Sequence, residues 1–237
     1  MTDTRATMRG IPGDAARKRG LRRIFVPLLV FGILFGFAFG VLLGNMDILP
    51  WWVGLILLVA AFITFFIFKK NHTSLVYGYF KGARGEEMVA GELARLPASW
   101  TIFNGLILPN GTDADHVAVG PQGIFIIETK HWRGNVSIEE GNLLANGRPL
   151  MKSPLIQVRT LTSELASFLE MSTSDVRGVL CFAGAQFHAA SQQIDEVTIC
   201  SYLNLSHVLT DAPTVLDAAE VATYVARLSS LTITQGL

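Results

Sequence analysis

Residues 115–130 read DHVAVGPQGIFIIETK, two runs rich in strand-forming residues joined by the turn sequence GPQG. This pattern predicts a tight antiparallel β-hairpin. Pairing Gly120 with Gly123 across the turn sets the register of both strands. In that register Asp115 lies directly opposite Glu128, and two acids therefore meet at the open end of the hairpin.

Like charges placed opposite each other destabilise a hairpin. Side chains alternate between the faces of a strand, so Glu128 and Lys130 share one face with Ile124 and Ile126. On an exposed strand, a Glu–Lys pair of this kind contributes less than ~1 kcal/mol and has no further meaning. Here the rest of the face is apolar, which favours a functional role. A bound divalent cation would turn the repulsion into attraction, and a cation beside a lysine suits phosphodiester cleavage.

Two long segments without charge precede the hairpin, at residues 24–43 and 51–68. Each approaches the ~20 residues that a membrane-spanning helix needs. The first segment is too long for the core of a signal peptide, and a second apolar segment follows it instead of a cleavage site. The sequence therefore predicts two transmembrane helices rather than buried core helices.

Charges on the flanks of these segments predict their orientation. The tail at 1–23 is basic, Lys69 and Lys70 follow the second segment, and the loop at 44–50 holds one acid and no base. By the positive-inside rule both ends of the hairpin face the cytoplasm and the loop lies outside. We expect a multi-pass protein of a bacterial-type inner (cell) membrane.

A short linker at 69–81, for which a helix is the alternative, leads to residues 82–237, a domain of ordinary size. The formally neutral chain is divided by charge: residues 1–80 hold nine Lys and Arg against three Asp and Glu, and residues 81–237 hold ten against 16. An acidic domain argues against a broad nucleic-acid-binding face, because phosphate contacts need basic residues. Cys181 and Cys200 lie in apolar runs and are expected to be reduced and structural.

Periodicity and punctuation give the other elements of the soluble domain. Ser153-Pro154 predicts the start of a helix, with Ser as the cap and Pro at the first helical position. Asn146-Gly147 predicts a tight turn. Residues 1–16 read as a mobile polar tail. The remaining expected elements are helices at 83–96 and 214–229 and strands at 101–108, 136–138, 143–145, 148–150, 178–183, 197–201 and 206–209. This order predicts an α/β fold with one mixed sheet flanked by helices, preceded by a transmembrane helical hairpin.

Two polar residues on the predicted helices are aligned with buried faces. Glu86 precedes Val89 by three residues and Leu93 by seven, so it projects from the apolar stripe of its helix. An acid in a first turn also interacts favourably with the helix dipole, but the dipole does not explain this alignment. Gln157 lies four residues before Leu161, at the border of the inner face of the next helix.

Glu86, Asp115, Glu128, Lys130 and Gln157 together resemble the pattern of the PD-(D/E)xK nuclease superfamily, and the local sequence is similar to the nuclease-related domain (NERD) family. The similarity covers roughly residues 80–170. The matching stretches are Gly82-Ala83-Arg84-Gly85-Glu86, the DHVAV run at 115–119, the GIFIIETK run at 123–130 with Trp132 and Gly134, and the PLIQ run at 154–157.

The resemblance implies a restriction-endonuclease-like fold and a Mg²⁺-dependent DNA nuclease activity, without naming the DNA structure that is cleaved. Asp115 and Glu128 are oxygen ligands of the kind that Mg²⁺ (or Mn²⁺) prefers. Glu86 and the main-chain carbonyl of Thr129 are further candidate ligands. Lys130 would activate the attacking water or stabilise charge on the phosphate, and Gln157 would orient Lys130 or that water.

Neighbouring residues have weaker claims. His116 points away from Asp115 by alternation, which favours a supporting role. We expect His131 to be exposed at the strand end and Trp132 to pack on the sheet. Contact with a nucleic acid is an alternative for His131, Trp132 and Arg133. Asp113 shares the face of Asp115 but lies nearer the strand end.

The sequence leaves two functions open. The first is a membrane-anchored, metal-dependent nuclease that acts on DNA at the cytoplasmic face. The second is a non-catalytic scaffold that uses the same fold to hold nucleic acid or a protein at the membrane, which the acidic domain motivates. A pore is disfavoured because neither span contains an ionisable residue. A GxxxGxxxG row at Gly32, Gly36 and Gly40 suggests a homodimer; no protein partner is written in the chain.

Overall fold

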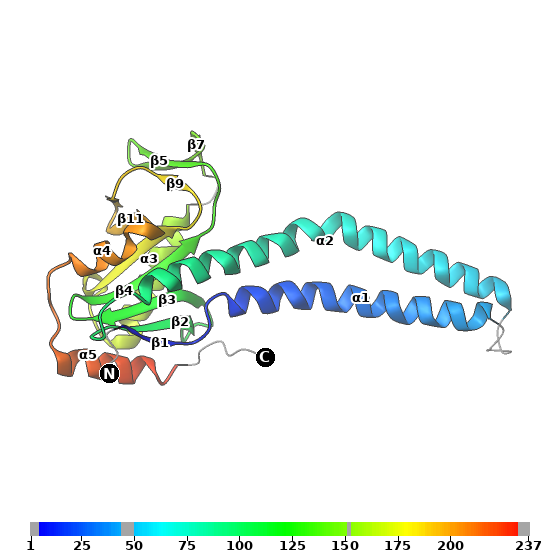
Figure 1. The fold of residues 1–237 in the computed structure, drawn as a ribbon, viewed down its shortest axis with the longest axis horizontal. Helices are drawn as coiled ribbons and strands as arrows, with labels where there is room; N and C mark the ends of the chain where they lie inside the picture. The colour runs from blue at the N-terminus through cyan, green and yellow to red at the C-terminus, as the bar shows by residue number, and fades with distance from the viewer. Residues whose placement is uncertain (1–4, 44–49, 151–152, 232–237) are drawn as a thin grey trace. The chain divides into compact units, whose positions relative to one another are not determined.

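The computed structural model describes residues 5–43, 50–150 and 153–231 (Figure 1). The chain divides into two compact units. One is Ala16–Lys81, and the other combines Met1–Ala15 with Gly82–Leu237. The predicted loop at 44–50 falls almost wholly outside the described residues.

The unit Ala16–Lys81 is a hairpin of two helices, built from α1 (Asp14–Leu42) and the first part of α2 (Trp51–Leu93). Asp14–Leu42 and Trp51–Lys69 are both long and apolar enough to cross a membrane. Phe31 of α1 contacts Phe62 and Phe65 of α2, with ring centroids 6.4 and 5.4 Å apart. The two helices therefore pack on each other through aromatic side chains.

Helix α2 joins elements that the sequence prediction listed separately: a span, a short linker at 69–81 for which a helix was an alternative, and a helix at 83–96. It runs unbroken from Trp51 to Leu93. No Pro interrupts this stretch, so the helix has no cause to stop at residues 69–81. A single helix thus connects the second apolar segment to Glu86.

The second unit is built on a large mixed sheet, which confirms the predicted α/β class (Figure 1). Its strands lie in the order β1-β2-β3-β4-β8-β11-β10. Strands β2, β3 and β4 are antiparallel neighbours, whereas β4, β8 and β11 run parallel. The bounds are β1 Thr7–Arg9, β2 Thr101–Ile107, β3 Asp113–Gly120, β4 Gly123–Lys130, β8 Val176–Phe182, β10 Ser191–Ile194 and β11 Val197–Ser201.

Helices cover both faces of this sheet. The end of α2 and the short α4 (Leu205–Thr210) share one apolar cluster with Ile127 and Val179. On the other face α3 (Pro154–Leu169) and α5 (Ala218–Leu228) share a cluster with Val117, Ile124 and Ile126. The buried strands between these layers explain the long apolar runs in the sequence.

A smaller sheet of four strands stands apart from the large one (Figure 1). Its order is β7-β6-β5-β9, and β6 and β7 meet at the predicted turn, where Asn146 and Gly147 both have positive φ. Its strands are β5 Asn135–Glu139, β6 Asn142–Ala145, β7 Arg148–Pro149 and β9 Gln186–Phe187; two 3₁₀ turns, Thr173–Asp175 and Tyr202–Asn204, complete the elements of the domain.

Two local predictions were wrong. The run at 206–209 is not a strand but part of α4, whose Leu205 and Leu209 lie one helical turn apart and are both buried. The mobile tail predicted at 1–16 is wrong for its described part, because Thr7–Arg9 forms β1 and pairs with Thr101–Phe103 of β2. Short apolar runs are ambiguous between helix and strand, and an edge strand of three residues has little periodicity.

Candidate active site

The β3–β4 hairpin has the predicted register. Gly120 pairs with Gly123, Val119 with Ile124, and the ladder continues to His116 and Ile127. It ends there, one step before Asp115 and Glu128. Beyond the ladder Asp115 reaches the backbone of β4: its Oδ2 accepts a hydrogen bond from the N–H of Thr129 at 2.8 Å.

Strand β4 ends in a compact polar group. The Lys130 ammonium donates to Glu128 Oε1 at 2.5 Å and to Gln157 Oε1 at 3.1 Å. Gln157 comes from the first turns of α3, which Ser153 caps by accepting from the N–H of Leu155. The cap and Pro154 fix where the helix begins, and this brings Gln157 to the end of β4. The structure thus brings together three of the predicted residues.

Burial and like charge act on the two acids. The Glu128 side chain is only 3% exposed, and burial raises its pKa, while Lys130 and Gln157 oppose that rise. Burial also raises the pKa of Asp115 well above its usual range, and the charges of Glu128 and Glu86 raise it further. Glu128 and Glu86 therefore both lie close enough to act on Asp115, and the raised pKa values of Asp115 and Glu128 mean that these two acids resist ionisation without a cation.

Glu86 reaches the site from α2. It is partly buried, whereas the neighbouring Glu87 is exposed, as the alignment of Glu86 with the apolar stripe indicated. Its Oε2 accepts a hydrogen bond from the backbone N–H of Gly13 at 3.0 Å. No feature of the predicted tail suggested this contact. The Pro12-Gly13 pair followed by Asp14 is a turn and helix-start signal that marks the place in the sequence.

The other candidates are placed as follows. His116 is fully buried, and burial lowers its pKa to about 3, in keeping with the supporting role expected of it. Trp132 packs on Phe182, with ring centroids 5.1 Å apart, which confirms the packing prediction. His131 is not a freely exposed side chain: Cβ atoms added at Gly85 and Gly184 would meet it at 2.6 Å. Arg133 is exposed and Asp113 is partly exposed.

A metal ion has a limited set of ligands here. Among the described residues no three His, Cys, Asp or Glu side chains are grouped to hold a metal ion. However, Glu128 Oε2 is buried and has no hydrogen-bond partner among the described residues. A bound cation would provide this oxygen with a partner. Mg²⁺ retains several waters and is commonly bound through one or two carboxylates. Asp115 and Glu128 therefore fit a hydrated divalent ion.

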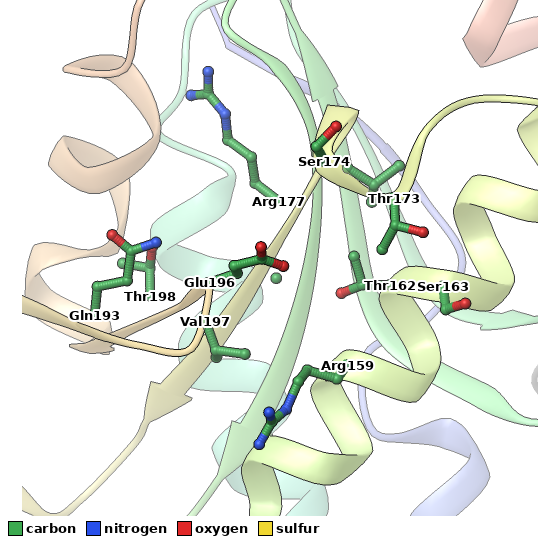
Figure 2. Close-up of a pocket in the computed structure, with 12 residues that line it drawn as sticks. Arg159, Thr162, Ser163, Thr173, Ser174, Arg177, Gln193, Glu196, Val197 and Thr198 are labelled. Carbon is green, nitrogen blue, oxygen red and sulfur yellow. The ribbon is translucent and has the colours of Figure 1, made fainter. Parts of the chain in front are cut away.

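A cavity of about 520 Å³ lies elsewhere, between α3, β8 and the β10–β11 hairpin (Figure 2). None of the predicted site residues lines it. Figure 2 shows the guanidinium groups of Arg159 and Arg177 pointing away from each other, with Glu196 between them. Arg159 bonds Asp195 at 3.1 Å, and Arg177 lies over the ring of Phe125. These cations do not converge on one point, so the group at the end of β4 remains the candidate site.

Comparison with known proteins gives a family resemblance for part of the chain. The family model described as the nuclease-related domain matches residues 81–183. The match includes Glu86, Asp115, Glu128, Lys130 and Gln157. No curated protein and no solved structure matches the chain.

Proposed function

We propose, from the match of residues 81–183 to the nuclease-related domain, that the protein is a membrane-anchored nuclease. In this proposal it hydrolyses DNA phosphodiester bonds with the aid of a divalent cation. The observation that supports the proposal most is the group of Asp115, Glu128, Lys130 and Gln157 at the end of β4. Acids with raised pKa values beside a lysine are typical of catalytic sites.

Each side chain has a defined task in this proposal. Asp115 and Glu128 would hold Mg²⁺ or Mn²⁺, with Glu86 and the Thr129 carbonyl as additional ligands. The bound ion supplies Lewis acidity and a more acidic water. Lys130 stabilises negative charge that develops on the phosphate as water adds to phosphorus and the bond to the leaving oxygen breaks. Gln157 accepts from Lys130 and keeps its ammonium at the strand end.

The apolar helices give the proposed location. With basic residues on both flanks, the nuclease domain and the N-terminus lie on the cytoplasmic side of a cell membrane. The domain is acidic and binds DNA weakly by itself. Attachment to the membrane offsets this by raising the local concentration of the domain near DNA held at the same surface.

The first span also offers a surface for a second copy. Cβ atoms added at Gly32 and Gly36 would meet nothing within 4 Å, so the packing of α1 on α2 does not use these positions. We propose that the row of Gly32, Gly36 and Gly40 forms a homodimer contact. Cysteines placed along the row should cross-link between copies on oxidation, and cysteines on the opposite side of α1 should not.

Cleavage of DNA by the full chain in lipid nanodiscs tests the nuclease function. A fragment that begins at residue 80 is unsuitable, because it lacks β1 and Gly13. Cleavage should require Mg²⁺ or Mn²⁺ and stop with a chelator. Glu128→Gln should abolish it, whereas Glu164→Gln, which changes an acid of α3, should not. Equal cleavage by Glu128→Gln and the wild type would identify a contaminating enzyme and refute the assignment.

A scaffold function is the second candidate. It is favoured by the acid excess of the domain, which weakens binding of DNA phosphates. Calorimetry separates the two functions. Mg²⁺ or Mn²⁺ binding that disappears in Asp115→Asn and Glu128→Gln supports the nuclease, and a wild-type chain that binds neither ion supports the scaffold.

A further inference from the structure

Residues 5–14, which we name the N-terminal strap, are an integral part of the nuclease domain. Its β1 segment adds a parallel strand to β2. The N–H groups of Ala6 and Thr7 donate to the carbonyls of Leu96 and Trp100 at 2.8 and 2.9 Å. Ala6 is buried in the same apolar cluster as Trp100. The strap is therefore held along the edge of the large sheet by backbone bonds and by packing.

A buried side-chain network also holds the strap. Asn104 of β2 donates through Nδ2 to the carbonyl of Arg9 at 3.1 Å, and its Oδ1 lies 2.8 Å from His116 Nδ1. Because the Asn104 amino group faces Arg9, its oxygen faces His116, and the proton of the neutral imidazole is assigned to Nδ1. Asn104 and His116 are both fully buried. His116 is the residue after Asp115 in β3. The network thus connects the strap to a strand of the candidate site.

The last residues of the strap contact Glu86. The Gly13 N–H donates to Glu86 Oε2 at 3.0 Å. Gly13 has φ of +75°, and an added Cβ would lie 2.8 Å from the backbone of Ala83. Only glycine suits both the left-handed conformation and this close approach. The sequence at Gly13 is therefore adapted to bring its N–H to the carboxylate.

We propose that Gly13 is a positioning residue for Glu86, whose carboxylate its N–H holds at the candidate site. Gly13 lies directly before α1, and Glu86 belongs to α2, so the strap fixes the Glu86 side chain from outside its own helix. The effect on cleavage rests on the proposed nuclease function, whereas the contact itself does not.

Hydrogen exchange of the full chain in nanodiscs tests the contact without metal or substrate. Glu86→Ala removes the acceptor, and Glu87→Ala, one residue further along α2, is the matched control. Exchange of the peptide that contains Gly13 should become at least ~10-fold faster in Glu86→Ala, the scale of losing one charge-assisted hydrogen bond. The control should stay within about twofold of the wild type. Unchanged exchange in Glu86→Ala would overturn the proposal.

Mn²⁺ affinity tests the positioning role. Gly13→Ala should weaken Mn²⁺ binding by about tenfold, as loss of a group that orients a ligand does. Gly141→Ala is the control, because Gly141 has a similar φ of +76° but open space around it. Equal Mn²⁺ affinity in Gly13→Ala and the wild type would refute the positioning role and leave the nuclease function standing. If the wild type binds no Mn²⁺ while Glu86→Ala still frees Gly13, the nuclease function fails and the contact holds.

Discussion

The two ends of the β3–β4 hairpin differ in chemistry although they belong to the same pair of strands. At the turn end Gly120 lies against the buried ring of Trp100, and Val119 and Ile124 belong to an apolar cluster. At the open end Glu128 is buried, Asp115 and Lys130 are partly buried, and the Lys130 ammonium donates to Glu128. The turn end is part of the hydrophobic core, whereas the open end holds charged groups whose burial lowers stability.

This difference teaches where stability and function lie in the domain. Apolar packing at the turn end stabilises the hairpin and fixes its register. Burial at the open end raises the pKa values of two acids, so keeping them ionised at neutral pH costs stability. Substitutions at the turn end should therefore lower stability, whereas removal of a buried charge at the open end should raise it.

Lys130→Ala should have the largest effect on activity. Removal of a preorganised cation that stabilises developing charge typically costs 10²–10³ in rate, so we expect DNA cleavage to fall at least ~100-fold. The measurement is initial cleavage rate with Mn²⁺ in nanodiscs, with Arg148→Ala as a control for an exposed cation of the same domain. A Lys130→Ala variant that cleaves within a few-fold of the wild type would show that the open end is structural.

Gly120→Ala should act on stability at the other end. An added Cβ would lie 2.2 Å from the Trp100 ring, so the ring or the strand must move. Overpacking of this kind costs about 1–3 kcal/mol, which urea titration of the full chain in detergent would measure. Gly91→Ala is the control, since that helical position has open space. No loss of stability in Gly120→Ala would mean that the turn end is loosely packed.

His116 sharpens the comparison because it lies beside Asp115 but faces the opposite side of β3. Burial lowers its pKa to about 3, whereas in the unfolded chain a histidine binds a proton below ~6.5. The unfolded state therefore gains a proton that the folded state refuses, and stability is lost as pH falls from about 6.5 toward 3. Between pH 7 and pH 5 the loss should be about 2 kcal/mol.

The experiment compares the pH dependence of the free energy of unfolding in the wild type, His116→Gln and the exposed-histidine control His188→Gln. His116→Gln should flatten the curve between pH 7 and pH 5, and the control should follow the wild type. Identical curves for the wild type and His116→Gln would mean that His116 accepts a proton in the folded state.

Asp115→Asn should have a smaller effect of opposite sign. The raised pKa of Asp115 means that the folded state binds its proton more tightly than the unfolded state does, so stability falls as pH rises through the folded pKa. Asn retains an oxygen for the Thr129 N–H and removes this cost. Without metal the variant should melt roughly 2–4 °C higher at neutral pH, the shift that ~1 kcal/mol gives in a chain of this size.

Added Mg²⁺ provides the second half of this test. It should stabilise the wild type increasingly as pH rises, because it competes with protons for the carboxylates. Asp115→Asn should lose that response. A variant that is less stable than the wild type without metal would contradict the idea that the open end costs stability.

Much of the fold and most of the candidate site were predictable because they depend on local patterns. Alternation and the GPQG turn set the register of β3 and β4, and the Ser153-Pro154 pair set the start of α3, so Glu128, Lys130 and Gln157 could be brought together from sequence. Long apolar runs likewise predicted the two helices of the hairpin.

The rest depends on contacts between distant segments, for which a single sequence has no periodic signal. Strand β1 contributes three residues and pairs with residues about 94 positions away, as Thr7 does with Thr101. The Gly13–Glu86 bond spans 73 positions and uses a backbone N–H that no side-chain pattern reveals. For residues 69–81 the sequence leaves both a linker and a helix open, because their polar composition favours a linker while no Pro interrupts them; the structure has the helix.

The smallest effect on the cleavage rate is expected for substitutions at the cavity between α3 and β8. They test whether the active site lies in this cavity or at the buried charged residues at the end of β4. Arg177 borders this cavity, and its guanidinium lies 5.3 Å from the centre of the Phe125 ring. Arg177→Ala should leave the cleavage rate within about twofold of the wild type, as substitutions away from a site usually do. The same assay as for Lys130→Ala applies, and Arg159→Ala serves as a second probe of the cavity wall. Arg177 is paired with Phe125 and Lys130 with Phe182, so the two basic residues are far apart along the β4–β8 ladder. A loss of cleavage rate as large as that of Lys130→Ala therefore cannot be transmitted through one local contact. Such a loss would instead assign substrate binding to the cavity and would reverse the contrast between the two ends of the hairpin.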